Sequence, residues 1–514
     1  MSKRRASAVV LPLAFAGMAR AALASAPVDE RIFGGKAPGE RASFLVVLRR
    51  QADVSGASAL PTRAERRRFV FEALRATADW TQRALRDRLV EAGARFRPFW
   101  LINMIEVEAD RTLAAELAGR EEVALVAADR PASLSRPEAT EPDISPLSAA
   151  GVEPSLELVR APAVWNIGAT GQGIVIGIAD TGVAWEHPAL KGRYRGFDGS
   201  SVSHGYNWHD AIHDAAPGNP CGSNSPFPCE DFVHGSHVTG TAVGTDGGEN
   251  RIGMAPGARW IGCRNMEHGE GTPARYTECF EFFLAPTDSD GENPRPDLGA
   301  DVINNSWYCP PEEGCTDPNV LRLLFENTRA AGIFLSVAAG NRGANGCASI
   351  DQAPALYEAS FSVGATSLAD TIAAFSSRGP VAIDGSNRLK PDVVAPGVSI
   401  RSSVPPDAYS AFQGTSMAAP HVSGAVALIW SAAPWLAGRV PETEEILRAT
   451  AVHLTSNEQC GGIPGSSVPN PIFGWGRIDV AAAVSAALLS GPPPAPRIPV
   501  SRSRPGSRTV SPRN

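Results

Sequence analysis

Gly414-Thr415-Ser416-Met417-Ala418-Ala419-Pro420-His421-Val422-Ser423-Gly424 is the most informative stretch of this chain. Its glycine turn places Ser416 at the start of an apolar, alanine-rich segment that is typical of a buried helix. Backbone N–H groups and the helix dipole favour a developing negative charge at such a position. Because a lone serine hydroxyl is a weak nucleophile, a reactive Ser416 needs a base, an orienting acid and an oxyanion donor from other segments.

An acid and an amide each follow an apolar run that is typical of a buried strand. Residues 174–179 lead to Asp180, and residues 333–338 lead toward Asn341. Catalytic groups in parallel sheets gather at the carboxyl ends of the strands, so Asp180 is a candidate acid and Asn341 a candidate oxyanion donor. Each also has a plainer interpretation, since Asp and Asn often serve only to form the turn after a strand.

Two histidines three residues apart, His234 and His237, begin a further helical segment. Histidines at this spacing can share one helix face and bind a metal. The sequence lacks the third ligand and the nearby glutamate base of the zinc-peptidase pattern. We therefore interpret His234, which is nearer the helix start, as a catalytic base and His237 as a structural residue.

Together these segments resemble the subtilases, the subtilisin-like serine peptidases, and the pattern is most similar to their bacillopeptidase F-like branch. The motifs occur in the family's Asp, His, Ser order. The resemblance covers about residues 153–487. The motifs are Asp-Thr-Gly-Val from Asp180, His-Gly-Ser-His-Val from His234 and Gly-Thr-Ser-Met-Ala-Ala-Pro-His-Val from Gly414.

The resemblance implies a serine endopeptidase that forms an acyl-enzyme on Ser416 and needs no cofactor for its chemistry. His234 would act as general base, and Asp180 would hold the imidazole in the productive tautomer. The Asn341 amide and the Ser416 N–H would form the oxyanion hole. The rival hypothesis, a binding protein with a dead site, predicts the loss of at least one of these residues, and all four are present.

Substrate binding is also implied by the resemblance, and here the chain departs from the family. Tyr308 stands where the family usually has glycine, and a phenol would fill space at the rim of the main specificity pocket. A dedicated processing protease with a narrow substrate range is therefore the alternative to a broad one. The implied substrate-binding residues are Ser306, Trp307, Tyr308, Ala338, Ala339 and Gly340.

Short apolar runs alternate with helical stretches throughout residues 153–490, the expected catalytic domain. Runs that are buried on both faces and separated by helices indicate a parallel sheet covered on both sides. The predicted fold class is α/β, a subtilisin-like three-layer fold with a mostly parallel sheet between helices. The six runs are residues 174–179, 260–263, 301–303, 333–338, 361–363 and 393–395.

Residues 40–135 predict a separate, small α+β unit. Its β-α-β-α-β order, with one further strand unassigned, fits a ferredoxin-like fold. Its position before the catalytic domain resembles that of the inhibitory propeptide of many subtilases. The expected strands are residues 44–48, 99–107 and 123–127, and the expected helices are residues 62–92 and 111–119.

The remaining segments predict export and processing. Residues 1–24 have a basic start, an apolar run and small residues, which is typical of a secretory signal peptide. Residues 25–39 are expected to be a linker, and residues 136–152 a linker with the processing region. Residues 491–514, rich in Pro, Arg and Ser, are expected to be disordered.

Composition limits the partners. The chain of 514 residues has a net charge of −7, and acidic residues predominate in the expected catalytic domain. This argues against nucleic acid as a partner. No segment has the roughly 20 apolar residues that span a bilayer. We expect a secreted monomer that acts on proteins or peptides and has its own propeptide as an intramolecular inhibitor.

All eight cysteines lie between residues 221 and 460. An even number in an exported domain indicates disulfides, and the closest pairs, Cys221–Cys229 and Cys309–Cys315, are the best candidates. Buried free thiols are the alternative, whereas a zinc cluster is disfavoured because CxxC spacing is missing. The segment 246–250, Asp-Gly-Gly-Glu-Asn, offers hard oxygen ligands, so structural calcium is left open but not placed.

Overall fold

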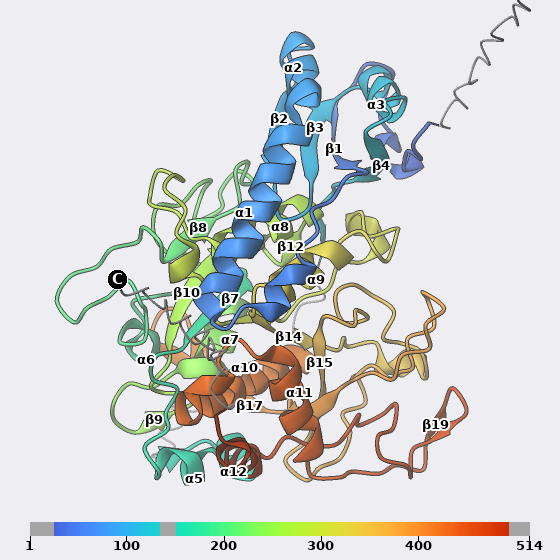
Figure 1. Ribbon diagram of the computed structural model, residues 1–514. Coiled ribbons are helices and arrows are strands. Elements are labelled where there is room, and N and C mark those ends of the chain that lie inside the picture. Colours follow the sequence, from blue (N-terminus) through green and yellow to red (C-terminus); the bar gives the residue numbers. More distant parts are fainter. Residues whose placement is uncertain (1–24, 134–150, 493–514) are drawn as a thin grey trace, which may run out of the picture.

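The computed structural model describes residues 25–133 and 151–492, which form two units packed against each other (Figure 1). We call residues 25–133 the N-terminal unit and residues 151–492 the large unit. The predicted signal peptide, the predicted tail beyond its first two residues and most of the predicted processing region lie outside the described residues. Within the described residues, no helix combines the length and the apolar character needed to cross a membrane.

The large unit is built on a seven-stranded sheet in which all neighbouring strands are parallel. The strand order is β16-β15-β14-β13-β7-β10-β8, and nearly every residue of these strands is buried. This confirms the predicted α/β fold with a parallel sheet between helices. The strands are β7 (Val175–Asp180), β8 (Trp208–Asp210), β10 (Arg259–Arg264), β13 (Val302–Asn305), β14 (Phe334–Ala338), β15 (Phe361–Thr366) and β16 (Val393–Pro396).

Each of the six predicted apolar runs overlaps one of these strands. The seventh strand, β8, was not predicted. It lies at the edge of the sheet, pairs with the end of β10 and belongs to the long segment between Asp180 and His234. Three residues are too few to show a strand pattern in the sequence.

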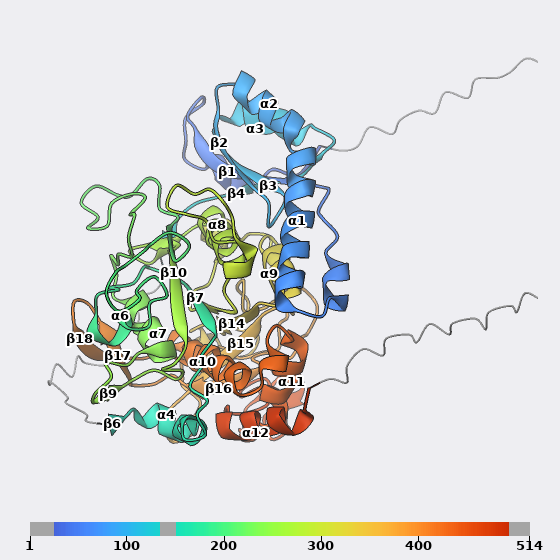
Figure 2. The ribbon, with the colours of Figure 1, turned by 60° about the vertical axis from the view of Figure 1, so that its left-hand side comes forward.

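Helices cover both faces of the sheet (Figure 2). α7 (His234–Val243) and α10 (Thr415–Ala432) pack together on one face. α8 (Pro273–Leu284) and α9 (Arg322–Ala330) cover the other face. Because successive side chains of a strand point to opposite faces, the sheet separates two apolar cores, one on each side.

The rest of the large unit consists of short elements around this framework. The helices are α4 (Pro154–Leu158), α5 (Ala161–Trp165), α6 (Pro188–Lys191), α11 (Val440–Ala449) and α12 (Val480–Ser490). The strands are β6 (Gly151–Val152), β9 (Asn250–Arg251), β11 (Met266–Glu267), β12 (Glu270–Gly271), β17 (Ile400–Val404), β18 (Ala408–Phe412), β19 (Gln459–Cys460) and β20 (Ile463–Pro464).

The eight cysteines form four disulfides. Both predicted pairs, Cys221–Cys229 and Cys309–Cys315, are confirmed. Cys263–Cys279 joins β10 to α8 beneath the sheet, and Cys347–Cys460 joins segments 113 residues apart. Only the folded chain brings the latter two pairs together.

The N-terminal unit has a four-stranded sheet in the order β2-β3-β1-β4. If α1 and α2 are counted as one helical segment, the chain order is β-α-β-β-α-β, which is that of a ferredoxin-like fold. The single strand expected over residues 99–107 is wrong, because β2 and β3 form an antiparallel pair on either side of a turn. The elements are β1 (Ala42–Leu48), α1 (Arg63–Thr81), α2 (Arg83–Glu91), β2 (Arg95–Phe99), β3 (Met104–Ala109), α3 (Arg111–Ala118), β4 (Val123–Ala128) and β5 (Ala132–Ser133).

The helix expected over residues 62–92 is divided into α1 and α2 at Gln82. The Gln82 side chain is fully buried, and its Nε2 donates to Phe99 O at 2.7 Å and to Asn103 Oδ1 at 2.8 Å. A buried amide must find partners, and here it finds them in the β2–β3 turn. The helical pattern of the sequence does not reveal these partners.

The expected linker over residues 25–39 is part of the folded N-terminal unit. Ile32 and Phe33 are buried in its core, and Val28 pairs with Val126 of β4. Two consecutive apolar residues, too few to indicate an element by themselves, here extend the core.

Polar contacts join the N-terminal unit to the large unit. The buried Arg67 of α1 donates to Asp301 Oδ1 at 2.7 Å and to Gly299 O at 2.9 Å. The β2–β3 turn faces α8, where Leu101 N donates to Glu281 Oε1 at 2.8 Å. Buried charges need such partners, so these contacts depend on both units being in place.

Candidate functional site

Three elements of the large unit bring Asp180, His234 and Ser416 to one edge of the sheet. Asp180 ends β7, His234 begins α7, and Ser416 is the second residue of α10. His234 Nδ1 lies 2.7 Å from Asp180 Oδ1, and both side chains are almost completely buried. A neutral imidazole that donates Nδ1–H to this carboxylate keeps Nε2 as its acceptor atom.

Ser416 lies just after a turn that requires glycine. Gly414 has a φ of 153°, and the helix begins immediately after it. Ser416 Oγ donates to Ser306 O at 3.2 Å, and Ser306 Oγ donates to Ser416 O at 2.9 Å. The hydroxyl therefore has a backbone acceptor in this structure and must rotate to use an imidazole as its acceptor.

Asn341 follows β14 and is held through its oxygen. Its Oδ1 accepts hydrogen bonds from Thr415 N at 2.9 Å and from Thr415 Oγ1 at 2.8 Å. These bonds fix the orientation of the carboxamide beside the first turn of α10. The amide nitrogen is then the donor group of Asn341 for a ligand in the cleft.

A small cleft connects these residues. Of the predicted site residues, Asp180 lies behind His234, and Ala339 is absent from the cleft lining. Two residues that the sequence did not indicate, Gln413 and Thr415, contribute to the lining. The lining residues are His234, Ser306, Trp307, Tyr308, Ala338, Gly340, Asn341, Gln413, Thr415 and Ser416.

The structure places Ala339 away from the cleft lining. Ala339 is buried in the core on the α8 side of the sheet, and its N–H donates to Val363 O at 3.0 Å. Ala338 and Gly340, its neighbours, line the cleft. Side chains alternate along an extended segment, so three consecutive residues cannot all face one pocket.

Glu230 is a further residue at the site that sequence reasoning missed. Its Oε1 accepts from Thr181 Oγ1 and from Ser236 N, each at 3.1 Å. Thr181 N donates to Asp180 Oδ1 at 2.8 Å, so Glu230 links the end of β7 to the start of α7. Burial, together with the nearby Asp180 charge, raises the pKa of Glu230 to about 8. The position of Glu230 close before His234 was the signal available in the sequence.

His237 does not lie in the cleft. It is fully buried, its Nε2 lies 2.9 Å from Ile400 O, and its ring stacks on Phe412. Burial lowers the pKa of His237 to about 3, so the ring is neutral. His237 Nε2 thus contacts backbone carbonyls of β17 and β18, whereas His234 lines the cleft.

The loop considered for calcium is closed by hydrogen bonds to its own carboxylate. Asp246 Oδ1 accepts from Gly248 N at 2.8 Å, and Asp246 Oδ2 accepts from Asn250 Nδ2 at 2.7 Å. Arg401 donates to Asn250 Oδ1 at 2.6 Å and to Glu153 Oε1 at 2.7 Å. A guanidinium therefore supplies the positive charge beside this loop.

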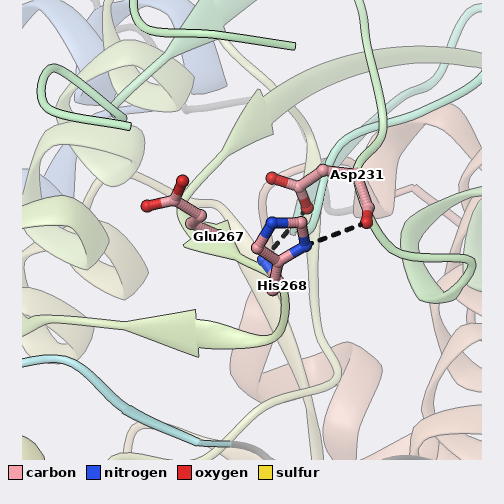
Figure 3. Close-up of side chains that lie close together, drawn as sticks. All are labelled: Asp231, Glu267 and His268. Atoms are coloured by element: carbon pink, nitrogen blue, oxygen red, sulfur yellow. Dashed lines mark hydrogen bonds between the residues drawn. The ribbon is translucent and has the colours of Figure 1, made fainter. Parts of the chain in front are cut away.

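Figure 3 shows a second group of potential ligands, Asp231, Glu267 and His268, with ligand atoms within 4.8 Å of one another. Asn219 Nδ2 donates to Asp231 Oδ2 at 2.6 Å and to Glu267 Oε1 at 2.8 Å. The buried Arg264 guanidinium lies 3.3 Å from Asp231 Oδ2. Arg264 thus pairs with Asp231, and Asn219 links the carboxylates of Asp231 and Glu267. These contacts hold the segment before His234.

Comparison with known proteins places this geometry in context. A family model described as "Subtilase family" matches residues 171–476. Bacillopeptidase F of Bacillus subtilis (strain 168) is 37% identical over 446 residues, which are 84% of this chain and 29% of that protein. Subtilisin of Bacillus pumilus is 30% identical over 302 residues, 58% of this chain and 91% of that protein. Subtilisin E of Bacillus subtilis (strain 168) is 30% identical over 299 residues, 58% of this chain and 65% of that protein. The chain thus spans less than a third of the length of bacillopeptidase F.

Proposed function

This chain belongs to the subtilase family, and from that premise we propose that it is a secreted serine endopeptidase that hydrolyses peptide bonds through an acyl-enzyme on Ser416. One observation carries the proposal: His234 lies 2.7 Å from Asp180 and lines the same cleft as Asn341 and Ser416. The chemistry uses side chains and backbone N–H groups alone. The four disulfides support an extracytoplasmic location, because such bonds persist in oxidising compartments.

The proposed reaction begins when the Ser416 hydroxyl turns from Ser306 O toward His234 and attacks the substrate carbonyl. His234 Nε2 accepts the hydroxyl proton and later gives it to the leaving amine, while Asp180 stabilises the imidazolium. Water then hydrolyses the acyl-enzyme by the same route. Catalytic contacts are often loose before substrate binds, so the present bond to Ser306 O is compatible with this role.

Two groups would stabilise the oxyanion. Asn341 would donate through its amide nitrogen, since Thr415 already occupies its oxygen, and Ser416 would donate through its N–H at the start of α10. The helix dipole adds to this stabilisation. Loss of one such donor typically lowers turnover about 10²–10³-fold.

We further propose that residues 40–135 are an inhibitory propeptide and that the chain is cut within residues 136–152. The buried Arg67–Asp301 pair and the Glu281 contact with Leu101 support a tight complex of the two units. At the end of the N-terminal unit, β5 pairs with β12 of the large unit, which adds backbone contacts between the two units. The mature enzyme would then act as a monomer on proteins or peptides.

A fluorophosphonate probe tests the proposed activity, because it reacts only with an activated serine. We expect covalent labelling of the purified protein at Ser416, none in Ser416→Ala, and normal labelling in Ser485→Ala, which removes an exposed hydroxyl of α12. We also expect Ser416→Ala to remain uncut between residues 136 and 152 in a protease-free host. A wild-type protein that is folded, separated from its N-terminal unit and unlabelled would contradict the proposal.

A narrow processing role is the second candidate function. The observation that favours it is Tyr308, a large side chain in the lining of a small cleft.

A further inference from the structure

We propose that Tyr308 restricts the cleft to substrates with a small side chain (glycine, alanine or serine) at the residue whose carbonyl Ser416 attacks. The inference rests on the proposed peptidase function and adds a substrate class to it. The structure supports it in three ways: the size of the cleft, the anchored backbone of Tyr308, and the fixed positions of Ala338 and Gly340 in the lining.

The cleft beside Ser416 is small. Its volume is about 20 Å³, and Tyr308, Ala338 and Gly340 are among the residues that line it. A cavity of roughly 10–15 Å³ on this measure holds one water molecule, so the space accepts a group about the size of a methyl. A leucine or phenylalanine side chain does not fit unless a wall moves.

Tyr308 cannot retreat with its backbone, because the residues on either side of it are anchored. Trp307 is almost fully buried, and its ring stacks on Tyr276 with centroids 3.8 Å apart. Cys309 forms the disulfide with Cys315, and its N–H donates to Ala353 O at 2.7 Å. Movement of Tyr308 is therefore limited to rotation of its side chain.

Ala338 and Gly340, which also line the cleft, are equally fixed. Ala338 is the last residue of β14, in the middle of the large sheet. Gly340 has a φ of 104°, its N–H donates to Thr415 Oγ1 at 3.2 Å, and a Cβ built on it would lie 3.0 Å from Ser377 Oγ. This wall lies against the rest of the protein and cannot move outward to admit a larger side chain.

The limit follows from packing. Well-packed sites tolerate extra methylene groups poorly, and one methylene changes selectivity about 10–200-fold. We therefore expect an alanine at the cleaved position to be preferred over phenylalanine by at least about 100-fold in kcat/KM. Removal of the ring should open the space that the phenol fills and reduce this preference.

The experiment compares wild type, Tyr308→Gly, Tyr308→Ala and Tyr308→Phe, each produced as the full chain and allowed to process itself. A denatured protein mixture is digested, and mass spectrometry identifies the residue that precedes each cut. Peptides that differ only at this residue then give kcat/KM. Fluorophosphonate labelling of each variant shows that its active site is assembled.

We expect wild type and Tyr308→Phe to cut after small residues, because both keep the ring. Tyr308→Gly and Tyr308→Ala should gain cleavage after leucine and phenylalanine by about 10-fold or more. Labelled wild-type enzyme that cuts freely after large residues would overturn this inference but leave the peptidase function intact. So would labelled glycine and alanine variants that keep the small-residue preference. A folded wild type that neither labels nor cuts would refute the proposed function itself.

Discussion

At the scale of single residues, the proposed Asp180–His234 pair depends on a carboxyl that does not touch the reacting atoms. Glu230 accepts from Thr181 and from Ser236, one on each of the two elements that carry the pair. The side chain is half-buried and its Oε2 is buried without a hydrogen-bond partner, so the neutral form is favoured at this position. In the proposed mechanism, Glu230 would be a positioning residue that acts through Asp180 and His234.

Two substitutions of Glu230 distinguish the loss of its hydrogen-bond acceptor from the loss of its ionisable carboxyl. Glu230→Gln keeps an oxygen acceptor and should retain kcat within a few-fold at pH 7. Glu230→Ala leaves Ser236 N without this acceptor and should lower kcat about 10- to 100-fold with little change in KM, because small displacements of catalytic groups are costly. Steady-state kinetics of both variants give the comparison. Equal kcat values for the two would contradict the positioning role.

A comparison of Glu230→Gln with wild type tests the charge state of Glu230. Its pKa in the folded protein is about 8, above the ordinary value of 4.5, so folding favours the protonated form. The stability that this preference provides is complete below pH 4.5 and is lost as the pH rises to about 8, at up to about 1.4 kcal/mol per pH unit. Glu230→Gln should lack this loss, so its free energy of unfolding should gain on that of wild type across this window. A constant difference between the two would show that Glu230 is not protonated.

At the scale of elements, two disulfides have different roles that follow from their positions. Cys347–Cys460 closes a separation of 113 residues, whereas Cys309–Cys315 closes only 6 and follows directly after Tyr308. Chain-entropy arguments assign about 5 kcal/mol to the first and about 2 kcal/mol to the second, in a model whose mechanism is debated. The long bond mainly limits the unfolded chain, and the short one fixes a wall of the cleft.

Paired serine substitutions test this division. Cys347→Ser with Cys460→Ser should lower Tm more than Cys309→Ser with Cys315→Ser, as measured by thermal unfolding monitored by circular dichroism. Cleavage after large residues should increase only in the second pair, because it alone releases Tyr308. An increase of this kind in the first pair, or in neither pair, would contradict the assignment of the 309–315 bond to the cleft.

At the scale of the whole molecule, the boundary between the two units buries carboxyl groups. Glu281 accepts from Leu101 N, and Asp129 Oδ1 accepts from Ala274 N at 2.8 Å. Burial raises the pKa of Glu281 to about 8 and that of Asp129 to about 7, and the nearby charges of Glu278 and Glu106 respectively add to these shifts. The pKa of Glu278 is instead held well below its ordinary value by Arg97, so it does not titrate in this range. The complex of the two units should therefore favour the protonated forms.

Inhibition by the cleaved N-terminal unit should weaken as the pH rises from about 4 to about 8, because separation returns Glu281 and Asp129 to water, where they ionise readily. The measurement is the dissociation rate of the cut complex, followed by recovery of activity. Glu281→Gln should flatten this dependence, and Glu91→Gln, which changes an exposed carboxylate on α2, should not. Tighter association at high pH would contradict this account.

Much of the site was predictable because it depends on local sequence. Asp180 and Asn341 follow apolar strands, and Ser416 begins an apolar helix, so their placement needed only the rule that parallel strands end at one edge. The side chain of Ala339 lies in the core because side chains alternate along an extended segment, and this direction is set by the fold. Gln413 and Glu230 were missed because their contacts form only in the folded chain; for Glu230, the local signal was only its position close before His234.

The sequence by itself determined the parallel sheet and the helices on both of its faces through apolar periodicity, and the family of the large unit through its motifs. Close cysteine spacing also made two of the four disulfides the best candidates, because spacing is a local property. The tertiary structure alone decided the break at Gln82, the β2–β3 pair, the Cys263–Cys279 and Cys347–Cys460 bonds and the size of the cleft beside Tyr308. Each of these depends on contacts between segments far apart in the chain, and the free energy of such contacts is set by burial and packing that no single stretch encodes.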